Sequence, residues 1–291
     1  MRADVSVVVP VFNRPVEAVN AAVLGLKADA EHLRIQLVVV DDCSSRPLDA
    51  DLLQAEGISI SVVRLSRNAG VSGAQNAGVA RAEGEYVCFV HSDDRLVANG
   101  VRARMDLAAS TGADVIGGAI VFGERIQQDP LVGASAQDFL RHRFGTHIAQ
   151  YLFRREVLCD EPFDARLRCW EDWDLLYRLA RSNTACASVE SIVAQIGDDV
   201  GQRLSTSIHM ATSLEQLRAK YAFEIEADRT IEGVWAFKLA RLYSSQFAPE
   251  HRAAARRWAI RAMFIQPWRI RRFVASTKRL VRSAARSRQT S

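Results

Sequence analysis

Short apolar runs alternate with helical patterns over the first 122 residues. The runs have the length and the β-branched or aromatic composition of strands, and two of them, at residues 37–40 and 87–90, read as strands buried on both faces. They cover residues 5–9, 37–40, 58–65, 87–90 and 115–122. Helical patterns stand between them, at residues 15–28, 48–56, 73–82 and 98–111. This alternation predicts a mainly parallel α/β sheet with right-handed crossovers and flanking helices.

The pattern loosens after Gly123, as if the chain leaves the regular sheet to form another surface. Residues 148–153 and 185–196 favour two more strands, and residues 170–181 favour a helix with acids in its first turn and arginines in its last. From about residue 206 only helical patterns remain. We therefore expect a catalytic domain over residues 1–204 and a C-terminal helical region over residues 205–291.

Charge is distributed unevenly, although the 48% hydrophobic and 25% charged residues are ordinary for a globular chain of 291 residues. From Glu250 onward there are twelve basic residues and one acid, and the preceding body carries more acids than bases. The five cysteines show no CxxC spacing, and we expect reduced thiols in a cytoplasmic protein. No apolar stretch approaches the roughly 18 residues of a membrane span.

Carboxylates follow two of the predicted buried strands. Asp41 and Asp42 come directly after one, and His91, Ser92, Asp93 and Asp94 follow another. Ligands bind beyond the carboxyl ends of parallel strands, and paired carboxylates there can hold a hard cation and a phosphorylated substrate. Turn formation or helix capping is the alternative for Asp41 and Asp42.

Four segments in this order resemble the family 2 glycosyltransferases, which are inverting enzymes with a GT-A nucleotide-sugar-binding fold. They are VSVVVPVFNR (5–14), VVVDDCSS (38–45), RNAGVSGAQNAG (67–78) with YVCFVHSDD (86–94), and CWEDWDLLYRLA (169–180). The resemblance implies a Rossmann-like GT-A domain and a donor that is a nucleotide diphosphate sugar, of the UDP or dTDP type. It implies as acceptor a hydroxyl of a saccharide or a lipid-linked saccharide.

The resemblance also assigns the donor site. Pro10 and Phe12 would flank the base, and Asp41 or Asp42 would accept a hydrogen bond from it. Asn68, Gly70 and Asn76 match the third segment, although tight turns are an equally good reason for each glycine. His91, Ser92 and Asp93 would contact the diphosphate, with Asp93 binding Mg²⁺ or Mn²⁺.

Three positions depart from the family pattern. Gln75 stands where an arginine is usual, and His91 stands where an aspartate is usual. The stretch around Gly197, QIGDD, lacks a histidine that is normally a metal ligand. We therefore expect a weaker metal site than is typical. A non-catalytic nucleotide-sugar-binding or assembly protein is the alternative function.

The fourth segment carries the catalytic base by resemblance. Asp172 would take the proton of the acceptor hydroxyl as its oxygen attacks the anomeric carbon. Glu171, Trp170 and Trp173 would contact the acceptor, with a tryptophan stacking on a sugar. From the residues alone, helix capping explains the acids equally well, and core packing is the commoner fate of tryptophan.

The basic C-terminal end has an apolar stripe at Ile270, Phe273, Val274 and Val281, set among arginines and lysines. This pattern favours peripheral binding to an anionic membrane surface, and a solvated helix with a frayed end is the alternative. Nothing in the sequence favours nucleic acid binding. No GxGxxG follows the first strand, which argues against an NAD enzyme. A homo-oligomer is compatible with the sequence.

Overall fold

The computed structural model describes residues 2–143, 145–158, 162–182, 184–197, 208–245 and 251–266. The chain divides into two compact units. Met1–Ala136 and Phe144–Gly201 form the first unit, and Gln137–Arg143 and Gln202–Ser291 form the second. The short segment 137–143 thus belongs to the helical unit, which the sequence patterns did not predict.

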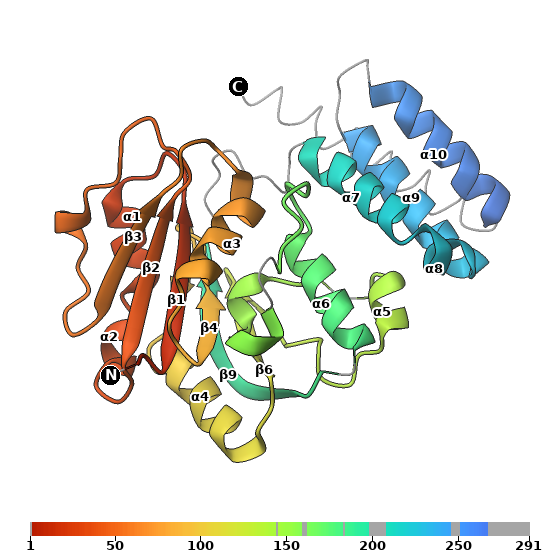
Figure 1. Cartoon of the computed structure of the whole chain (residues 1–291). Helices are drawn as coiled ribbons and strands as arrows, with labels where there is room; N and C mark the ends of the chain where they lie inside the picture. The colour runs from red at the N-terminus through yellow and green to blue at the C-terminus, as the bar shows by residue number, and fades with distance from the viewer. Residues whose placement is uncertain are drawn as a thin grey trace. The chain divides into compact units, whose positions relative to one another are not determined.

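Four parallel strands form one half of the sheet in the first unit (Figure 1). They are β1 (Val5–Val11), β2 (Ile35–Asp41), β3 (Ser59–Arg64) and β4 (Tyr86–Phe89), in the order β3-β2-β1-β4. The central strand β1 pairs with both β2 and β4, so that Val7 lies beside Leu37 and Cys88. The carboxyl ends of β1, β2 and β4 therefore meet at one edge.

The other half of the sheet is mixed. Strand β8 (Leu152–Arg154) runs antiparallel between β4 and β6 (Val115–Phe122), and β9 (Cys186–Ile196) is parallel to β6. Two short strands, β5 (Arg95–Leu96) and β7 (Arg125–Gln127), pair antiparallel with β9 and β6. The strand predicted at residues 148–153 is instead a 3₁₀ turn, η2 (Ile148–Gln150), followed by β8.

Helices complete the first unit. They are α1 (Val16–Val23), α2 (Leu26–Asp29), α3 (Gly70–Arg81), α4 (Gly100–Thr111) and α6 (Glu171–Arg181), with the 3₁₀ turns η1 (Ala50–Leu52) and η3 (Arg155–Leu158). Helix α5 (Ala136–Leu140) begins at Ala136, and its remaining residues belong to the second unit. The helix predicted over residues 48–56 is only the short turn η1. Helix α3 begins at Gly70, inside the stretch predicted to be a loop.

The core forms on both faces of β1. Val5, Val7 and Val9 alternate into an apolar cluster that includes residues of α1 and α4. Val8 points to the opposite face, where α3 packs so closely that a Cβ on Gly78 would lie 2.2 Å from Val8 Cγ1. The small residues of α3 therefore allow the helix to approach the sheet, as the sequence predicts.

The second unit is helical. Its helices are α7 (Ile208–Lys220), α8 (Ala222–Glu226), α9 (Arg229–Ser245) and α10 (Arg252–Ile265). Trp235 is fully buried, and its Nε1 donates a 2.8 Å hydrogen bond to the carbonyl of Leu140, which ties segment 137–143 to α9. Among the described helices, none has the length and apolarity that a membrane span requires. The predicted apolar stripe from Ile270 to Val281 lies outside the described residues.

Candidate active site

Asp41 and Asp42 hold the loops at the end of β2. The Asp41 carboxylate accepts hydrogen bonds from the Ser44 and Leu48 amides and from the Arg64 guanidinium. Burial alone would raise the pKa of Asp41, but these donors outweigh it and lower the pKa. Asp42 accepts from Ala69 N at 2.6 Å and Gly70 N at 2.9 Å, at the start of α3.

Both carboxylates are almost fully buried, and their contacts are those of turn and helix-capping residues. Burial raises the pKa of Asp42 despite its two amide donors. The structure therefore supports the structural role of both residues. Their role in binding a base stays a prediction.

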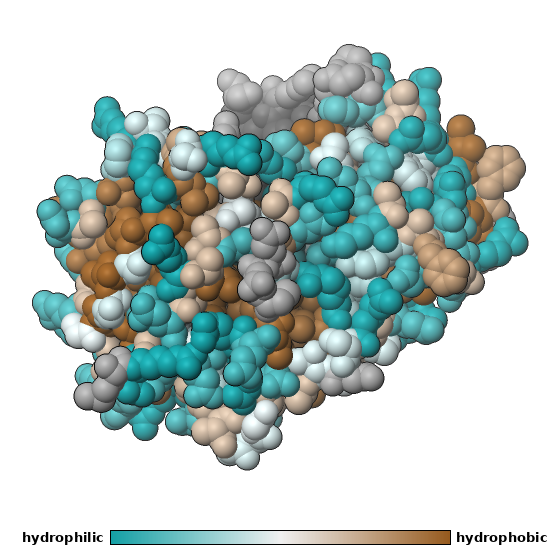
Figure 2. Space-filling view, in the orientation of Figure 1, coloured by the Kyte–Doolittle hydropathy of each residue, from teal (hydrophilic) through white to brown (hydrophobic). Residues whose placement is uncertain are grey.

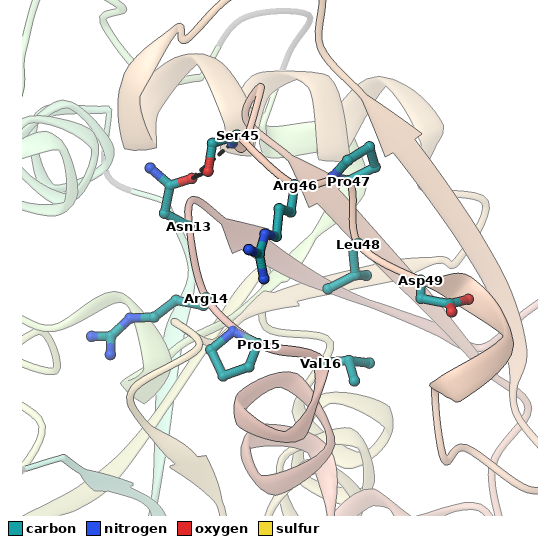
Figure 3. Close-up of a pocket in the computed structure, with 9 residues that line it drawn as sticks. All are labelled: Asn13, Arg14, Pro15, Val16, Ser45, Arg46, Pro47, Leu48 and Asp49. Carbon is teal, nitrogen blue, oxygen red and sulfur yellow. Dashed lines mark hydrogen bonds between the residues drawn. The ribbon is translucent and has the colours of Figure 1, made fainter.

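A cavity of about 330 Å³ opens between the loops that follow β1 and β2 (Figure 3). Asn13 has a left-handed backbone, with a φ of 51°, and its side-chain oxygen accepts hydrogen bonds from the amide and the hydroxyl of Ser45. Arg46 extends between the loops in Figure 3, and Arg14 extends away from Arg46. The neighbouring Phe12 is 49% exposed, so its ring is accessible, as a base-stacking residue requires.

The third family segment, residues 67–78, forms hydrogen bonds with the loop before α6. Asn76 exchanges two hydrogen bonds with the backbone of Phe163, and Asn68 accepts one from Arg168. Gly70 has a φ of +75°, and a Cβ there would lie 2.9 Å from the Arg168 guanidinium. Asn76 thus has a positioning role, and Gly70 meets a backbone requirement that favours glycine.

Two histidines and a buried aspartate gather beyond β4. Nδ1 of His91 lies 3.7 Å from Oδ2 of Asp94, and Nε2 of His147 lies 3.4 Å from the same oxygen. One candidate ligand atom from each of the three residues falls within 4.8 Å of the others. Nδ1 of His147 caps η2 by accepting from Ala149 N, which directs Nε2 at Asp94. We call these three residues the His/Asp cluster.

Asp93, the predicted metal ligand, is not part of the His/Asp cluster. Its side chain is 38% exposed and lies 3.9 Å from the Arg14 guanidinium. The sequence pointed to Asp94 as one of two paired carboxylates able to hold a cation, but it did not single out His147. His147 lies in an irregular segment and joins the site only through the fold.

The three positions that depart from the family pattern, Gln75, His91 and Gly197, all lie at or beside the His/Asp cluster. Nε2 of Gln75 lies 3.4 Å from Nε2 of His91. The Gly197 amide donates to Asp94 Oδ1 at 3.1 Å, and a Cβ on Gly197 would lie 2.0 Å from the carbonyl oxygen of Asp93. A side chain at position 197 is therefore incompatible with this backbone arrangement.

Helix α6 brings its acids to the same place. Burial lowers the pKa of His147 to about 4, the charge of His91 adds to that effect, and the charges of Asp172 and Asp93 oppose it. Burial also raises the pKa of Glu171 to about 7, the charge of Asp172 adds to this, and the charge of His91 opposes it. That Asp93 and Asp172 share one site stays a prediction.

The tryptophans beside these acids differ from one another. Trp170 is partly exposed and starts α6 in a left-handed conformation, with a φ of 69°. Trp173 is 1% exposed and stacks on Tyr177 at a ring-centroid distance of 5.2 Å. The prediction that Trp173 contacts an acceptor is therefore corrected, because its ring packs in the core.

Known proteins with similar sequences are glycosyltransferases and polysaccharide biosynthesis proteins. The chain is 29% identical over 204 residues to the succinoglycan biosynthesis protein ExoO of Rhizobium meliloti, which covers 63% of this chain and 58% of ExoO. It is 27% identical over 173 residues to the GalNAc(5)-diNAcBac-PP-undecaprenol beta-1,3-glucosyltransferase of Campylobacter jejuni, covering 55% of this chain and 54% of that protein. The chain thus spans a little over half the length of these two relatives.

Solved structures show the same fold. The S. aureus protein TarS (residues 1–349), in complex with UDP-GlcNAc, superimposes with a TM-score of 0.65 at 17% identity and covers 99% of this chain and 92% of its own. The mannosyltransferase PcManGT of Pyrobaculum calidifontis, in complex with GDP-Man and Mn²⁺, gives 0.56 at 16% identity, with 96% and 86% covered. The sequence model of glycosyl transferase family 2 matches residues 6–158, and the chain belongs to this family.

Proposed function

We propose that the chain transfers a sugar, with inversion, from a nucleotide diphosphate sugar to a hydroxyl of a saccharide or lipid-linked saccharide. The observation that carries the proposal is that a chain of glycosyl transferase family 2 gathers His91, Asp94 and His147 beyond the carboxyl end of β4, beside the predicted diphosphate ligand Asp93. In the proposal, Asp93 serves the diphosphate and Asp172 serves the attacking hydroxyl. The TarS complex with UDP-GlcNAc favours a uridine donor.

Asp172 is the general base in this proposal. As the acceptor oxygen attacks the anomeric carbon, its proton passes to the Asp172 carboxylate and the bond to the diphosphate breaks on the opposite face. The Asp172 carboxylate also accepts a 2.7 Å hydrogen bond from Trp173 N, which fixes its orientation at the start of α6. Glu171, Trp170 and the exposed ring of Phe12 keep their predicted roles in binding acceptor and donor.

The test is Asp172→Asn in the purified chain. We expect transfer from the donor to fall by about 10²-fold or more, the scale of general-base catalysis, with donor binding retained. Asp106→Asn is the matched control, because that side chain is 70% exposed on α4. Full transfer by Asp172→Asn would remove Asp172 from the mechanism. Absence of both transfer and donor hydrolysis in the unmodified chain would favour the non-catalytic alternative.

The His/Asp cluster fits a divalent cation. The candidate ligand atoms of His91 and His147 lie 3.7 and 3.4 Å from Oδ2 of Asp94, and all three atoms fall within 4.8 Å of one another, close enough to face one ion. Two imidazoles and one carboxylate suit Mn²⁺ better than Mg²⁺, which prefers oxygen ligands. We propose that this cluster, with Asp93 as the predicted further ligand, holds Mn²⁺. When bound, the ion would offset the charge of the diphosphate.

Electron paramagnetic resonance measures this binding without any turnover, because the signal of free Mn²⁺ falls when the protein binds the ion. We expect His147→Ala to weaken Mn²⁺ binding by about tenfold or more, and excess Mg²⁺ to compete poorly. The exposed His32→Ala is the matched control. Equal Mn²⁺ affinity in His147→Ala and the unmodified chain would show that the cluster is not the metal site.

A further inference from the structure

One face of helix α10 packs against the other helices of its own unit. Trp258 is 6% exposed, and its Nε1 donates to Glu215 of α7 at 3.2 Å. At the end of the helix, Gln266 Nε2 donates to the carbonyl of Thr230 at 3.0 Å. These contacts bury one side of α10 against the other helices of the unit.

The opposite face of α10 is apolar over its last two turns. Ile260, Met263 and Phe264 are 49%, 39% and 80% exposed and follow one another at helical spacing. A surface helix normally presents polar side chains to solvent, so this stripe is not explained by packing within the unit. Brown and tan side chains stand among teal ones over α8, α9 and α10 in Figure 2.

A second exposed ring belongs to the same surface. Phe223 of α8 is 86% exposed, the highest exposure among the large apolar residues described. Arg261 of α10 pairs with Glu226 of α8 at 3.4 Å. Phe223 precedes Glu226 by about one helical turn, and Phe264 follows Arg261 by about one turn. Each ring thus stands about one turn along its own helix from one partner of the ion pair that joins α8 and α10.

Positive charge borders this apolar surface. Helix α10 contains four arginines and no acid. Arg257 and Arg261 pair with glutamates of the unit, whereas Arg252 and Arg256 are exposed and form no ion pair within the part of the chain that the structure describes. The sequence beyond residue 266 adds eight basic residues and no acid.

We propose that this surface binds the face of an anionic phospholipid bilayer. Its residues are Phe223, Arg252, Arg256, Ile260, Met263 and Phe264, and we call them the membrane face. Exposed aromatic and aliphatic side chains enter the boundary between headgroups and acyl chains, and the arginines pair with acidic headgroups. An isolated apolar face would suit a protein partner equally well, but two arginines without an ion pair among the described residues, and the basic sequence that follows, favour a lipid surface. The proposal does not depend on the reaction at the active site.

Co-sedimentation of the full chain with vesicles tests the membrane face. The probes are phosphatidylcholine vesicles with and without phosphatidylglycerol. We expect binding to the mixed vesicles only, and a decrease of about tenfold or more in partitioning for the double variant Phe223→Ser/Phe264→Ser. Arg252→Gln/Arg256→Gln should weaken binding and reduce its dependence on salt.

The matched control is Leu24→Ser/Leu52→Ser, which removes two apolar side chains that are 68% and 54% exposed in the first unit. Because all the replaced side chains are exposed, thermal unfolding should confirm that each variant is folded. Unchanged binding of Phe223→Ser/Phe264→Ser would assign the attraction to the basic end alone and overturn the proposal. Equal binding to both vesicle types would overturn it too. A third outcome would also overturn it: the unmodified chain binds no vesicles but self-associates as its concentration rises, and Phe223→Ser/Phe264→Ser abolishes that self-association.

Discussion

Glu171 shows how a single buried group near the site couples folding to pH. Burial and the charge of Asp172 raise its pKa to about 7, from an ordinary value of 4.5. The folded chain therefore keeps this proton up to about pH 7, whereas the unfolded chain releases it near pH 4.5. Ionisation between these values favours the unfolded state, so the free energy of unfolding falls as pH rises through this window.

Glu171→Gln should remove that dependence. We expect the variant to be more stable than the unmodified chain at pH 8, by on the order of 2–3 kcal/mol, and to differ little at pH 4.5. Thermal unfolding at the two pH values measures the difference. The exposed Glu190→Gln serves as control. An equal change in melting temperature at both pH values would contradict the raised pKa of Glu171.

Gly197 tests how tightly the end of β9 is packed on the acidic loop. A methyl group there would lie 2.0 Å from the Asp93 carbonyl oxygen, which is backbone and cannot move away alone. We expect Gly197→Ala to destabilise the fold by about 1–3 kcal/mol, as overpacking does. Gly145→Ala is the control, because its nearest neighbour would be 3.7 Å away. The same melting temperature for both variants would show that the contact is easily relieved.

At the scale of single residues, the sequence pointed to His91 and the paired acids Asp93 and Asp94, but not to His147, which completes the His/Asp cluster. Strand ends and short motifs mark the acids, because local patterns indicate where strands stop. His147 has no such signal, since it comes from an irregular segment that the fold brings beside Asp94. Trp173 was misassigned because a tryptophan in a first helical turn can face either the core or solvent.

At the scale of elements, the order of the strands was harder to predict than their existence. The parallel half β3-β2-β1-β4 follows from the alternation of strands and helices, and the GT-A fold is confirmed. A strand was predicted at residues 148–153, of which only the end belongs to β8, and the antiparallel pairing of β8 between β4 and β6 was not predicted. Its three residues are too few to show a periodicity, and strand pairing depends on partners distant in sequence.

The close packing of α3 on β1 leads to a prediction for Gly78. A Cβ at this position would lie 2.2 Å from Val8 Cγ1, so a larger side chain must push the helix off the sheet. We expect Gly78→Val to lower the free energy of unfolding by about 1–3 kcal/mol or more. Chemical denaturation measures this, with Ala80→Val as control for the helix propensity of valine at an exposed position of the same helix. Equal losses would exclude a packing effect.

At the scale of the whole molecule, two separate segments of the chain form the helical unit, Gln137–Arg143 and Gln202–Ser291. We predicted a boundary after residue 204, and the compact units change over after Gly201, but no pattern in the sequence indicated that residues 137–143 belong with the C-terminal helices. The segment is short and of mixed polarity. Its attachment depends on Trp235, Lys238 and Asp228, which lie almost a hundred residues further along the chain.

Trp235→Ala in the full chain should therefore release segment 137–143. The substitution removes a fully buried indole and its hydrogen bond to Leu140, at a cost of about 3–5 kcal/mol within the helical unit. We expect trypsin to cut faster after Arg141 and Arg143, with mass spectrometry identifying the sites. The control is Phe223→Ala, which removes an exposed ring from the same unit. Arginines of the first unit, such as Arg104, which is buried against the sheet, should stay protected because their packing does not involve Trp235. Equally rapid cleavage after Arg104 would instead mean that the two units unfold as one.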